Sequence, residues 1–452
     1  MEKDQNPKYK ILMFPWLAHG HIFPFLELAK RLSKRNFNIY LCSTPINLYS
    51  IKTNMQKDVS NYSSIELIEL QIPQSKELPQ ELHTTKNLPS NLLPILLQTF
   101  QKSSSSFKDI INSLKPDLLI YDFFQPWAPK YALSQGIPSV YFATSGATPF
   151  SFFHHLYTNG TSSDFISQAI YILDQEKMYV RSRLEENIKD ADKDFAFGNF
   201  TMSSDIVLVK SCSEVEAKYI DYLSILTKKQ VIPTGPLIAD SINEEEHSDI
   251  MDWLNGKKHR STVYISFGSE YFVSKEQIED IAKGLEISDV NFIWIVRFPP
   301  TEKLISNEDA LPKGFMERVK DRGLVLFGWA PQTKILGHLS IGGFVSHCGC
   351  SSITESMYFG VPVIGMPMKF DQPINARLMV EVGVGIEVLR ERNGQYLGEE
   401  IAKAINKVIV DKVFSEGVRY KAKDLSEKIK EKEEQEMDEA AEQLIRLCMK
   451  NI

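Results

Sequence analysis

Cysteine is scarce in this chain of 452 residues, and its scarcity excludes the small disulfide-stapled folds. The five cysteines are odd in number and scattered, at Cys42, Cys212, Cys348, Cys350 and Cys448. Secreted scaffolds need many paired cysteines, so this pattern favours reduced thiols and a cytoplasmic protein. Cys348 and Cys350 stand one residue apart without a second pair, which makes a poor zinc site.

Long apolar runs, an excess of positive charge and glycine-rich nucleotide loops are also missing. No stretch approaches the roughly 20 apolar residues of a membrane span, and the early run ILMFPWLA is too short for a signal peptide. The formal net charge is −7, which argues against nucleic acid and against an anionic membrane surface. The absence of GxGxxG and of GxxxxGK[ST] argues against a nicotinamide dehydrogenase and a P-loop NTPase.

What the chain does contain is a repeated alternation of short apolar strands and amphipathic helices. An apolar run at Lys10–Leu17 is followed by the loop 18–21, by apolar residues at helical spacing, and by a second strand at Phe37–Ser43. We expect further strands at 65–72, 117–121, 138–143, 205–210, 261–267, 292–297 and 323–327, one helix over 91–114, and a terminal amphipathic helix from about 424. This rhythm indicates an α/β fold with parallel sheets and crossover helices.

A polar, acidic stretch, ADSINEEEHS at 239–248, interrupts the rhythm. We interpret 1–238 as an N-terminal Rossmann-like domain, 239–250 as a linker, 251–430 as a second Rossmann-like domain, and 431–452 as a helix that packs back towards the first domain. In such doubly wound domains, ligands bind at the carboxyl ends of the strands. The loops 18–21, 121–125 and 267–269 are therefore predicted to open on one cleft between two facing halves.

His21 and Asp122 each follow an apolar strand and are candidates for acid–base chemistry. A neutral imidazole can take a proton from a hydroxyl, and a carboxylate can fix its tautomer and stabilise the imidazolium. His21 could instead be a capping or core histidine, and His19 is a rival base. Asp122 could instead cap a helix. Gly268, before Ser269, would let the backbone approach an anion at the start of a helix.

The stretch from Trp329 to Gln372 carries the strongest signal: WAPQTKILGHLSIGGFVSHCGCSSITESMYFGVPVIGMPMKFDQ. Trp329 offers a ring that could stack on a base, although it could also be a core residue. His347 and Ser352 stand where a loop becomes a helix, a place that suits phosphate, and Glu355 could accept two ribose hydroxyls. Asp371 and Gln372 precede Pro373 and are predicted to end an extended segment, where they would bind a hexose.

This window resembles the 44-residue signature box of the plant family 1 UDP-dependent glycosyltransferases, which also begins with Trp and ends with Gln. The remainder of the chain agrees from residue 11 to 448. FPWLAHGHIFPFLELAKRL is similar to the family's start, and YDFFQPWAP and SFGSEYF resemble the subgroup that adds a sugar to an existing glycoside. The resemblance implies a GT-B fold of two facing Rossmann-like domains and an inverting transfer without metal or other cofactor.

The resemblance also assigns roles by position. It makes His21 the catalytic base and Asp122 its partner, and it implies that the terminal Gln of the box selects UDP-glucose. It places Thr144 near the 6-hydroxyl of the sugar. The donor-binding residues that it implies are Thr144, Ser269, Trp329, Ala330, Gln332, His347, Cys350, Ser351, Ser352, Glu355, Asp371 and Gln372.

Two positions depart from the family pattern, which normally reads HCGWNS where this chain reads HCGCSS. Cys350 stands in place of a Trp that lines the donor sugar, and Ser351 stands in place of an Asn. Loss of the indole removes a wall of roughly 150–250 Å². The substitution would loosen the donor site, admit a different sugar, or weaken turnover, while the backbone N–H at 350 could still serve.

The resulting hypothesis is an enzyme that transfers glucose from UDP-glucose to a sugar hydroxyl of a small-molecule glycoside in plant secondary metabolism, acting as a monomer. Alternatives are transfer of xylose, rhamnose or glucuronate, glycosylation of an aglycone, a weakly active UDP-sugar-binding protein, and a sugar-nucleotide epimerase. Aromatic residues suit the wall of a flavonoid or terpenoid acceptor pocket, and core packing is the alternative reading for each of them. These residues are Phe23, Phe123, Phe124, Trp127 and Phe142.

Overall fold

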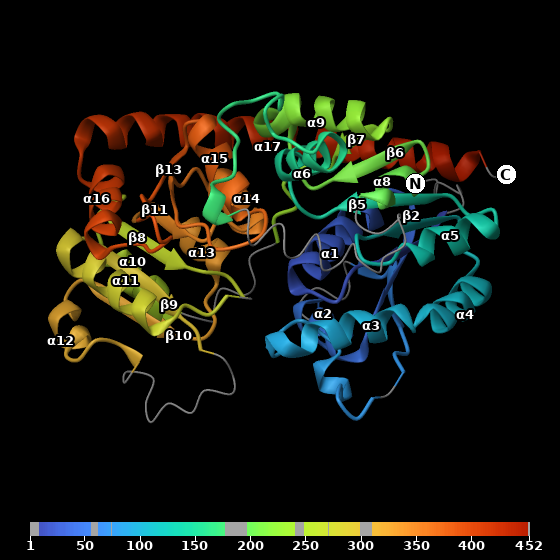
Figure 1. The fold of residues 1–452 in the computed structure, drawn as a ribbon, viewed down its shortest axis with the longest axis horizontal. Helices are drawn as coiled ribbons and strands as arrows, with labels where there is room; N and C mark the ends of the chain where they lie inside the picture. The colour runs from blue at the N-terminus through green and yellow to red at the C-terminus, as the bar shows by residue number, and fades with distance from the viewer. Residues whose placement is uncertain are drawn as a thin grey trace, which may run out of the picture. The chain divides into compact units, whose positions relative to one another are not determined.

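The computed structural model describes residues 9–55, 62–73, 75–176, 197–239, 248–269, 271–298 and 310–450. These residues form two compact units (Figure 1). The first unit contains 9–164, 197–237 and 431–450, and the second contains 165–176 and 238–430. The segment 165–176 therefore belongs to the second unit, although the range expected for the first domain includes it. Of the expected linker, residues 240–247 lie outside the described residues.

The first unit is built on a parallel sheet of seven strands in the order β3-β2-β1-β4-β5-β6-β7. Its strands are β1 (Tyr9–Phe14), β2 (Phe37–Ser43), β3 (Ile65–Glu69), β4 (Leu118–Tyr121), β5 (Ser139–Ala143), β6 (Ile206–Val209) and β7 (Gln230–Pro233). The strands are short and almost entirely buried at the centre of the sheet, as expected where helices cover both faces.

The helices of the first unit are α1 (His19–Ser33), α2 (Pro45–Met55), α3 (Leu93–Gln101), α4 (Ser104–Leu114), α5 (Trp127–Ser134), α6 (Ala147–Asn159), α8 (Gly198–Met202) and α9 (Ser213–Thr227). Two 3₁₀ turns, Gln80–Leu82 and Ser90–Leu92, lie between β3 and α3. The last part of the terminal helix joins this unit, where Met437 and Leu444 enter the core beside α1 and Arg35 Nε pairs with Asp438 Oδ1 at 2.7 Å.

The second unit contains a parallel sheet of six strands in the order β10-β9-β8-β11-β12-β13. Its strands are β8 (Thr262–Ser266), β9 (Asn291–Val296), β10 (Gly323–Phe327), β11 (Ile341–Ser346), β12 (Val363–Gly365) and β13 (Gly385–Glu387). The helices are α10 (Ser248–Asn255), α11 (Lys275–Ser288), α12 (Phe315–Val319), α13 (Gln332–Leu336), α14 (Cys350–Phe359), α15 (Gln372–Glu381), α16 (Gly398–Ile409) and α17 (Lys412–Met449).

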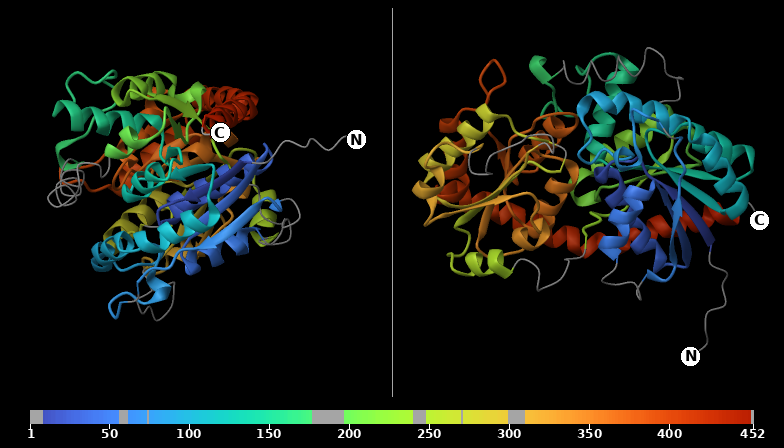
Figure 2. Two further views of the ribbon diagram at one scale, coloured as in Figure 1. Left: turned by 90° about the vertical axis from the view of Figure 1, so that its right-hand side faces the viewer. Right: turned by 90° about the horizontal axis from the view of Figure 1, so that it is seen from below.

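Alternation along the strands of the second sheet explains why helices cover both of its faces (Figure 2). In β9, Phe292, Trp294 and Val296 pack into the cluster that includes α11 and α16. The intervening Ile293 and Ile295 pack into the opposite cluster, which includes α10 and α13. Because successive side chains of a strand point to opposite faces, a continuous apolar run can build two cores. The structure confirms the expected α/β class.

Three local expectations need correction. The helix predicted over 91–114 is two helices, α3 and α4, which break at Lys102 and Ser103; the Ser103 hydroxyl donates to the Phe100 carbonyl, and serine competes with helical bonding in this way. Helix α1 begins at His19, inside the predicted loop. The terminal helix begins at Lys412, about a dozen residues earlier than expected.

Both sheets reverse their strand order at one place, and this determines where a ligand can bind. In the first sheet the reversal lies between the neighbouring strands β1 and β4, and in the second it lies between β8 and β11. Open α/β sheets bind ligands at the carboxyl ends of strands beside such a reversal. His21 follows β1 and Asp122 follows β4, whereas Ser269 follows β8 and His347 follows β11.

Candidate active site

His21 lies in the first turn of α1 and points its Nδ1 at the carboxylate of Asp122. The distance from Nδ1 to Asp122 Oδ2 is 2.8 Å, and the side chain of His21 is 26% exposed whereas that of Asp122 is 1% exposed. A carboxylate only accepts hydrogen bonds, so Nδ1 carries the hydrogen and Nε2 carries the lone pair. The pair has the chemistry of a general base that is oriented by a carboxylate.

Backbone N–H groups bind both oxygens of the Asp122 carboxylate. Its Oδ2 accepts the backbone N–H of Trp16 at 2.8 Å, and its Oδ1 accepts the N–H of Phe123 at 2.7 Å. The alternative role as a helix cap does not apply, because α5 begins at Trp127 and Pro126 precedes it. Two buried N–H groups and the His21 ring therefore fix the carboxylate.

Thr144 follows β5 and reaches the same histidine, a contact that the sequence did not suggest. Its Oγ1 lies 3.1 Å from His21 Nδ1, and the residue is 7% exposed. Because that nitrogen carries a single hydrogen directed towards Asp122, the hydroxyl is placed to share it. The first unit thus brings together three of the predicted site residues around one imidazole ring.

Aromatic rings surround this group, but the predicted ones divide into two kinds. Phe124 packs tilted at 6.1 Å from the His21 ring, and Phe123 is partly exposed and contacts Phe124. Phe142 is fully buried and packs on Phe25, so its ring belongs to the core and not to an open wall.

Two more of the predicted aromatic residues make their ring contacts elsewhere. Trp127 packs on Phe14 and Phe107. The Phe23 ring lies edge-on to His19, at 5.0 Å. Neither contact reaches the His21 ring, and Trp127 supports the core.

Two further aromatic residues, which no sequence motif selects, pack against Phe123: Phe150 is partly buried and Phe197 is buried. The ring centroid of Phe150, on α6, lies 6.3 Å from that of Phe123. The ring centroid of Phe197, just before α8, is also 6.3 Å from that of Phe123, and these two rings pack edge to face. They belong to segments that contain no recognisable sequence motif, so only the packing of their rings identifies them. One aromatic group thus lies beside His21, made of Phe123, Phe124, Phe150 and Phe197.

In the second unit, two glycines enclose the ring of His347. A β-carbon on Gly268 would lie 2.7 Å from Cε1 and Nε2 of that ring, and one on Gly349 would lie 2.6 Å from Nε2. Gly268 also has a φ of +76°, in the left-handed region that favours glycine. The sequence predicted that Gly268 makes room for an anion; the structure shows that it also makes room for His347.

The electrostatic setting of His347 keeps its imidazole neutral. Burial lowers the pKa of His347 to about 4, and the positive charge of Lys369 acts in the same direction, while the Ser266 backbone opposes both. A neutral imidazole has one N–H donor and adds no charge of its own. At pH 7 His347 therefore adds no positive charge beside the start of α14.

Helix α14 begins directly after this loop, with Gly349 as its cap and Cys350 as its first residue. The first N–H that bonds within the helix belongs to Ile353 and reaches the Gly349 carbonyl at 3.1 Å. The N–H groups of Cys350, Ser351 and Ser352 precede it, so they lie at the positive end of the helix dipole. Ser352 is 7% exposed, and the other two are half-buried.

Gln332 orients the carboxylate of Glu355, a link that the sequence did not predict. The amide Nε2 of Gln332 donates to Glu355 Oε2 at 2.7 Å and lies 3.3 Å from the Ser352 hydroxyl. The Tyr264 hydroxyl donates to Oε1 of the same glutamine at 3.4 Å. The first turn of α13 and the second turn of α14 are thereby joined. The half-buried Glu355 carboxylate is held in one orientation, as a ligand for a pair of hydroxyls requires.

Trp329 is 65% exposed, which excludes the alternative that it is a core residue. It follows Gly328, whose φ of +107° turns the chain at the end of β10. The next residue, Ala330, is 6% exposed and belongs to the core cluster with Leu336. The loop is thus anchored by Ala330 and presents the indole outwards, as a stacking surface requires.

Asp371 and Gln372 begin a helix and do not end an extended segment, contrary to the prediction. Asp371 has a φ of −79° and a ψ of −10° and caps α15, in whose first turn Pro373 lies. Proline is tolerated there because a first-turn N–H has no helical partner. The buried Gln372 uses Oε1 to accept the N–H groups of Met368 and Lys369, at 2.9 and 2.8 Å, which fixes the orientation of its amide.

The described part of the chain contains neither a metal-binding cluster nor a membrane-spanning helix. No group of three or more His, Cys, Asp or Glu side chains there could hold a metal ion. Among the same residues, none of the helices is long and apolar enough to cross a membrane.

The family model for UDP-glucoronosyl and UDP-glucosyl transferase matches residues 115–440. The chain belongs to this family. It is 49% identical over 456 residues to UDP-glucosyltransferase 29 of Panax ginseng, with 99% of this chain and 98% of that protein covered. It is 45% identical over 441 residues to the β-D-glucosyl crocetin β-1,6-glucosyltransferase of Gardenia jasminoides, with 96% and 98% covered.

A solved structure extends the likeness to the fold. The crystal structure of a UGT transferase from Siraitia grosvenorii in complex with UDP matches with a TM-score of 0.78 and 25% identity, covering 97% of this chain and 100% of that one. This UDP-glycosyltransferase therefore has the GT-B fold of two Rossmann-like domains, and the resemblance of the signature box is confirmed at the level of the family.

Replacing Trp329 with alanine should weaken UDP binding by about 10-fold to 100-fold, because stacking on a base contributes roughly 1–3 kcal/mol. The exposed indole supports little of the core, so the melting temperature should stay unchanged. Calorimetric titration with UDP measures the first quantity, and Trp329→Phe, which keeps a stacking ring, is the control. A lower melting temperature with unchanged UDP affinity would show that Trp329 is structural.

Replacing Gly268 with alanine should raise the KM for the UDP-sugar about 10-fold, because the new methyl group would displace His347. The matched control is Gly394→Ala in the same unit. Gly394 has a φ of +87°, yet a β-carbon there meets nothing within 4 Å. Both variants carry the left-handed backbone penalty of about 1–2 kcal/mol. An equal rise of KM in both would mean that backbone strain alone is responsible.

Proposed function

We propose that this enzyme transfers glucose from UDP-glucose to a hydroxyl of the sugar of a small-molecule glycoside, with inversion at the anomeric carbon. The observation that carries the proposal is the buried Asp122 carboxylate held 2.8 Å from His21 at the strand-order reversal of the first sheet. A base oriented in this way is what deprotonation of an acceptor hydroxyl requires. The second unit supplies the groups that suit a nucleotide sugar.

The proposed reaction is one displacement. His21 Nε2 takes the proton of the acceptor hydroxyl as its oxygen forms a bond to the anomeric carbon. The bond from that carbon to the β-phosphate oxygen breaks on the opposite face, and its electron pair leaves with UDP. The α-linked donor gives a β-linked product, and Asp122 stabilises the imidazolium that forms.

We propose that protein groups, without a metal, stabilise the departing diphosphate. The N–H groups at the start of α14 and the Ser352 hydroxyl are hydrogen-bond donors at the positive end of a helix dipole. We assign His347 and Ser269, which follows β8, to the same diphosphate. Trp329 stacks on the uracil, Glu355 accepts the ribose hydroxyls, and the pair at 371–372 binds the hexose. Cys350 and Ser351 line the sugar through the first turn of α14.

The glucose and glycoside assignments draw on named relatives. Two relatives that span nearly the whole chain carry glucosyltransferase names, and one of them is named for a glucoside acceptor. The aromatic group of Phe123, Phe124, Phe150 and Phe197 suits an apolar aglycone beside the His21 base. We assign that group, together with Phe23, to the acceptor.

A second candidate is the same transfer with a different donor sugar, and Cys350 favours it. Cys350 is half-buried in the first turn of α14, where its small side chain leaves the space of an indole. A wider wall would admit a sugar other than glucose. We place this candidate second because Gln372 is held in place by two backbone hydrogen bonds and matches the usual glucose selector.

The test is a cross of four donors against two acceptor classes, scored by mass. UDP-glucose, UDP-xylose, UDP-rhamnose and UDP-glucuronate are each combined with aglycones and with their monoglucosides. The proposal expects a hexose added to monoglucosides from UDP-glucose. Products from aglycones alone would overturn the sugar-extending part, and a preferred second donor would establish the other candidate. No product would support a UDP-sugar binder, and conversion of the donor without acceptor would support an epimerase.

We also propose that the enzyme works in the cytoplasm as a monomer. None of the five cysteines forms a disulfide, and four of them are buried. Burial raises the pKa of the Cys448 thiol to about 12 and that of Cys348 well above its ordinary value. Unpaired thiols of this kind suit a reducing compartment. Size-exclusion chromatography with light scattering tests the monomer.

A further inference from the structure

Helix α15 carries at its start the two residues assigned to the donor hexose, and several bonds hold that start. Asp371 Oδ2 accepts from Asn375 Nδ2 at 3.1 Å, and the same amide donates to the Cys348 carbonyl at 3.0 Å. Gln372 is bonded to the loop before the helix. Any movement of α15 along or about its axis therefore displaces the hexose ligands.

Arg377, one turn and a half further along α15, is a buried cation with a bidentate partner. Its Nη1 lies 2.8 Å from Glu176 Oε2, and its Nη2 lies 3.0 Å from Oε1 of the same carboxylate. The two side chains are 3% and 4% exposed. Parallel bonds of this type define the geometry of both partners more closely than a single charged contact.

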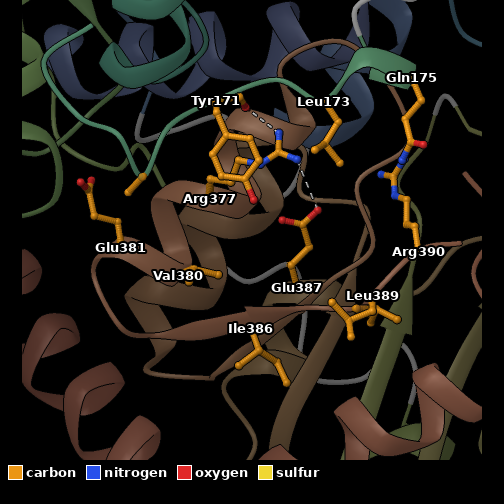
Figure 3. Close-up of a pocket in the computed structure, with 12 residues that line it drawn as sticks. Tyr171, Leu173, Gln175, Arg377, Val380, Glu381, Ile386, Glu387, Leu389 and Arg390 are labelled. Carbon is orange, nitrogen blue, oxygen red and sulfur yellow. Dashed lines mark hydrogen bonds and ion pairs between the residues drawn. The ribbon is translucent and has the colours of Figure 1, made fainter. Parts of the chain in front are cut away.

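The segment 165–176 folds around that guanidinium. Arg377 Nη1 donates to the Tyr171 carbonyl at 2.7 Å, and the Tyr171 ring covers the guanidinium at 4.2 Å (Figure 3). Glu176 Oε2 also accepts the N–H of Leu173, at 2.8 Å. One turn beyond Arg377, Glu381 accepts the Ser167 hydroxyl at 2.5 Å. The segment is thus fastened to two successive turns of α15.

A hollow of about 510 Å³ lies beside these contacts, between the segment, α15 and the end of β13. Figure 3 shows Leu173, Val380, Ile386 and Leu389 around it, with Arg377 and Glu387 on its wall. The hollow is open to solvent, so no side chains pack against its lining on that side. On this side, therefore, charged and polar contacts hold the helix where packed side chains would otherwise do so.

The same cluster reaches the loop that anchors Gln372. Glu387 Oε1 lies 3.7 Å from Arg377 Nη2. Three residues on, Arg390 Nε donates to the Tyr396 hydroxyl at 2.6 Å, and that hydroxyl donates to the Pro367 carbonyl at 2.9 Å. Pro367 directly precedes Met368, whose N–H binds Gln372. Charges around Arg377 therefore support both sides of the turn that holds the hexose ligands.

We propose that Arg377 and Glu176 are positioning residues for the donor sugar: by fastening the segment 165–176 to α15 they hold Asp371 and Gln372 at the distance that hexose binding requires. The inference rests on the proposed function, in which those two residues bind the hexose. The uracil and ribose ligands lie on other elements, at Trp329 and Glu355. Loss of the pair should therefore weaken binding of the sugar and leave binding of the nucleotide intact.

The test compares UDP-glucose with UDP in Arg377→Met, Glu176→Gln and the double variant. Calorimetry should show UDP-glucose bound about 10-fold more weakly, because small misplacements of binding groups have large effects, with UDP affinity within about twofold of the parent. Steady-state kinetics should show the same rise in KM for the donor. Arg377→Lys keeps the charge without the fork and should fall between Arg377→Met and the parent.

The double variant keeps the inference testable if a single variant does not fold. It removes both charges of the Arg377–Glu176 pair, so its melting temperature should recover towards the parent value, while its affinity for UDP-glucose stays low. Parental UDP-glucose affinity in the double variant, or an equal loss for UDP and UDP-glucose, would overturn the inference. Glu286→Gln, which breaks an exposed pair with Arg318 in the same unit, is the control and should change neither affinity.

The outcomes also separate this inference from the proposed function. A parent protein that binds UDP but gains nothing from the glucose would contradict the assigned hexose ligands and with them the proposed function. A parent that prefers UDP-glucose, with variants that bind it equally well, would contradict only the positioning role of Arg377 and Glu176.

Discussion

Replacing His21 with alanine should lower kcat about 1,000-fold and leave the affinity for UDP unchanged. The physical reason is that a positioned general base contributes roughly 10²–10⁴-fold to a proton transfer. Replacing the imidazole with a methyl group removes the ring that the buried Asp122 carboxylate orients. Donor ligands lie on other elements, so the nucleotide should bind as before. Turnover with saturating donor and calorimetry with UDP measure the two quantities.

His19→Ala is the matched control, because His19 is two residues earlier on the same helix and was the rival base. Its ring lies edge-on to Phe23 at 5.0 Å, whereas the Asp122 carboxylate contacts His21. We expect His19→Ala to retain most of the turnover. Unchanged turnover in His21→Ala, or a larger loss in His19→Ala, would contradict the assignment of the base.

Replacing Asp122 with asparagine should lower kcat about 100-fold with little change in donor affinity. The carboxylate accepts three N–H groups, from Trp16, Phe123 and His21. An amide has only one oxygen, so its NH₂ group must face at least one buried donor, which costs roughly 1–3 kcal/mol. The neutral side chain also no longer stabilises the imidazolium, whichever way the amide turns.

Measurements of kcat, of donor affinity and of the melting temperature separate a catalytic role of Asp122 from a role in folding. A loss of kcat with a small fall in melting temperature is the expected result. An equal loss of kcat and of donor affinity, together with a large fall in melting temperature, would mean that Asp122 mainly supports the fold. Asp117→Asn offers a comparison, since Asp117 Oδ2 also accepts a backbone N–H, from Lys10, but at an exposed site.

Much of this arrangement could be predicted from local patterns. The strand at Phe37–Ser43 and that at Gly323–Phe327 have the bounds that their apolar runs indicate. His21 and Asp122 could be selected together, although 101 residues separate them, because each follows a buried strand and parallel strands end at one edge. Trp329 could be proposed for stacking from its place in a loop.

Other features depended on neighbours that are distant in the sequence. Thr144 was assigned to the sugar, and the structure places its hydroxyl at His21 Nδ1. Gly268 was assigned to an anion, and the structure sets it against His347. Phe142 was a candidate wall residue but is fully buried, because β5 lies inside the sheet and not at its edge. None of these contacts has a signal in the residues adjacent along the chain.

The sequence by itself determined the α/β rhythm, the order of the chemical groups in the window from Trp329 to Gln372, and the family, because apolar periodicity and side-chain chemistry are local properties. Only the tertiary structure decided which strand ends lie side by side, that two glycines enclose His347, that Gln332 orients Glu355, and that the segment 165–176 is fastened to α15 through Arg377. Each of these depends on the packing of residues far apart in the chain, where strand order and helix position, and not the local pattern, bring the atoms together.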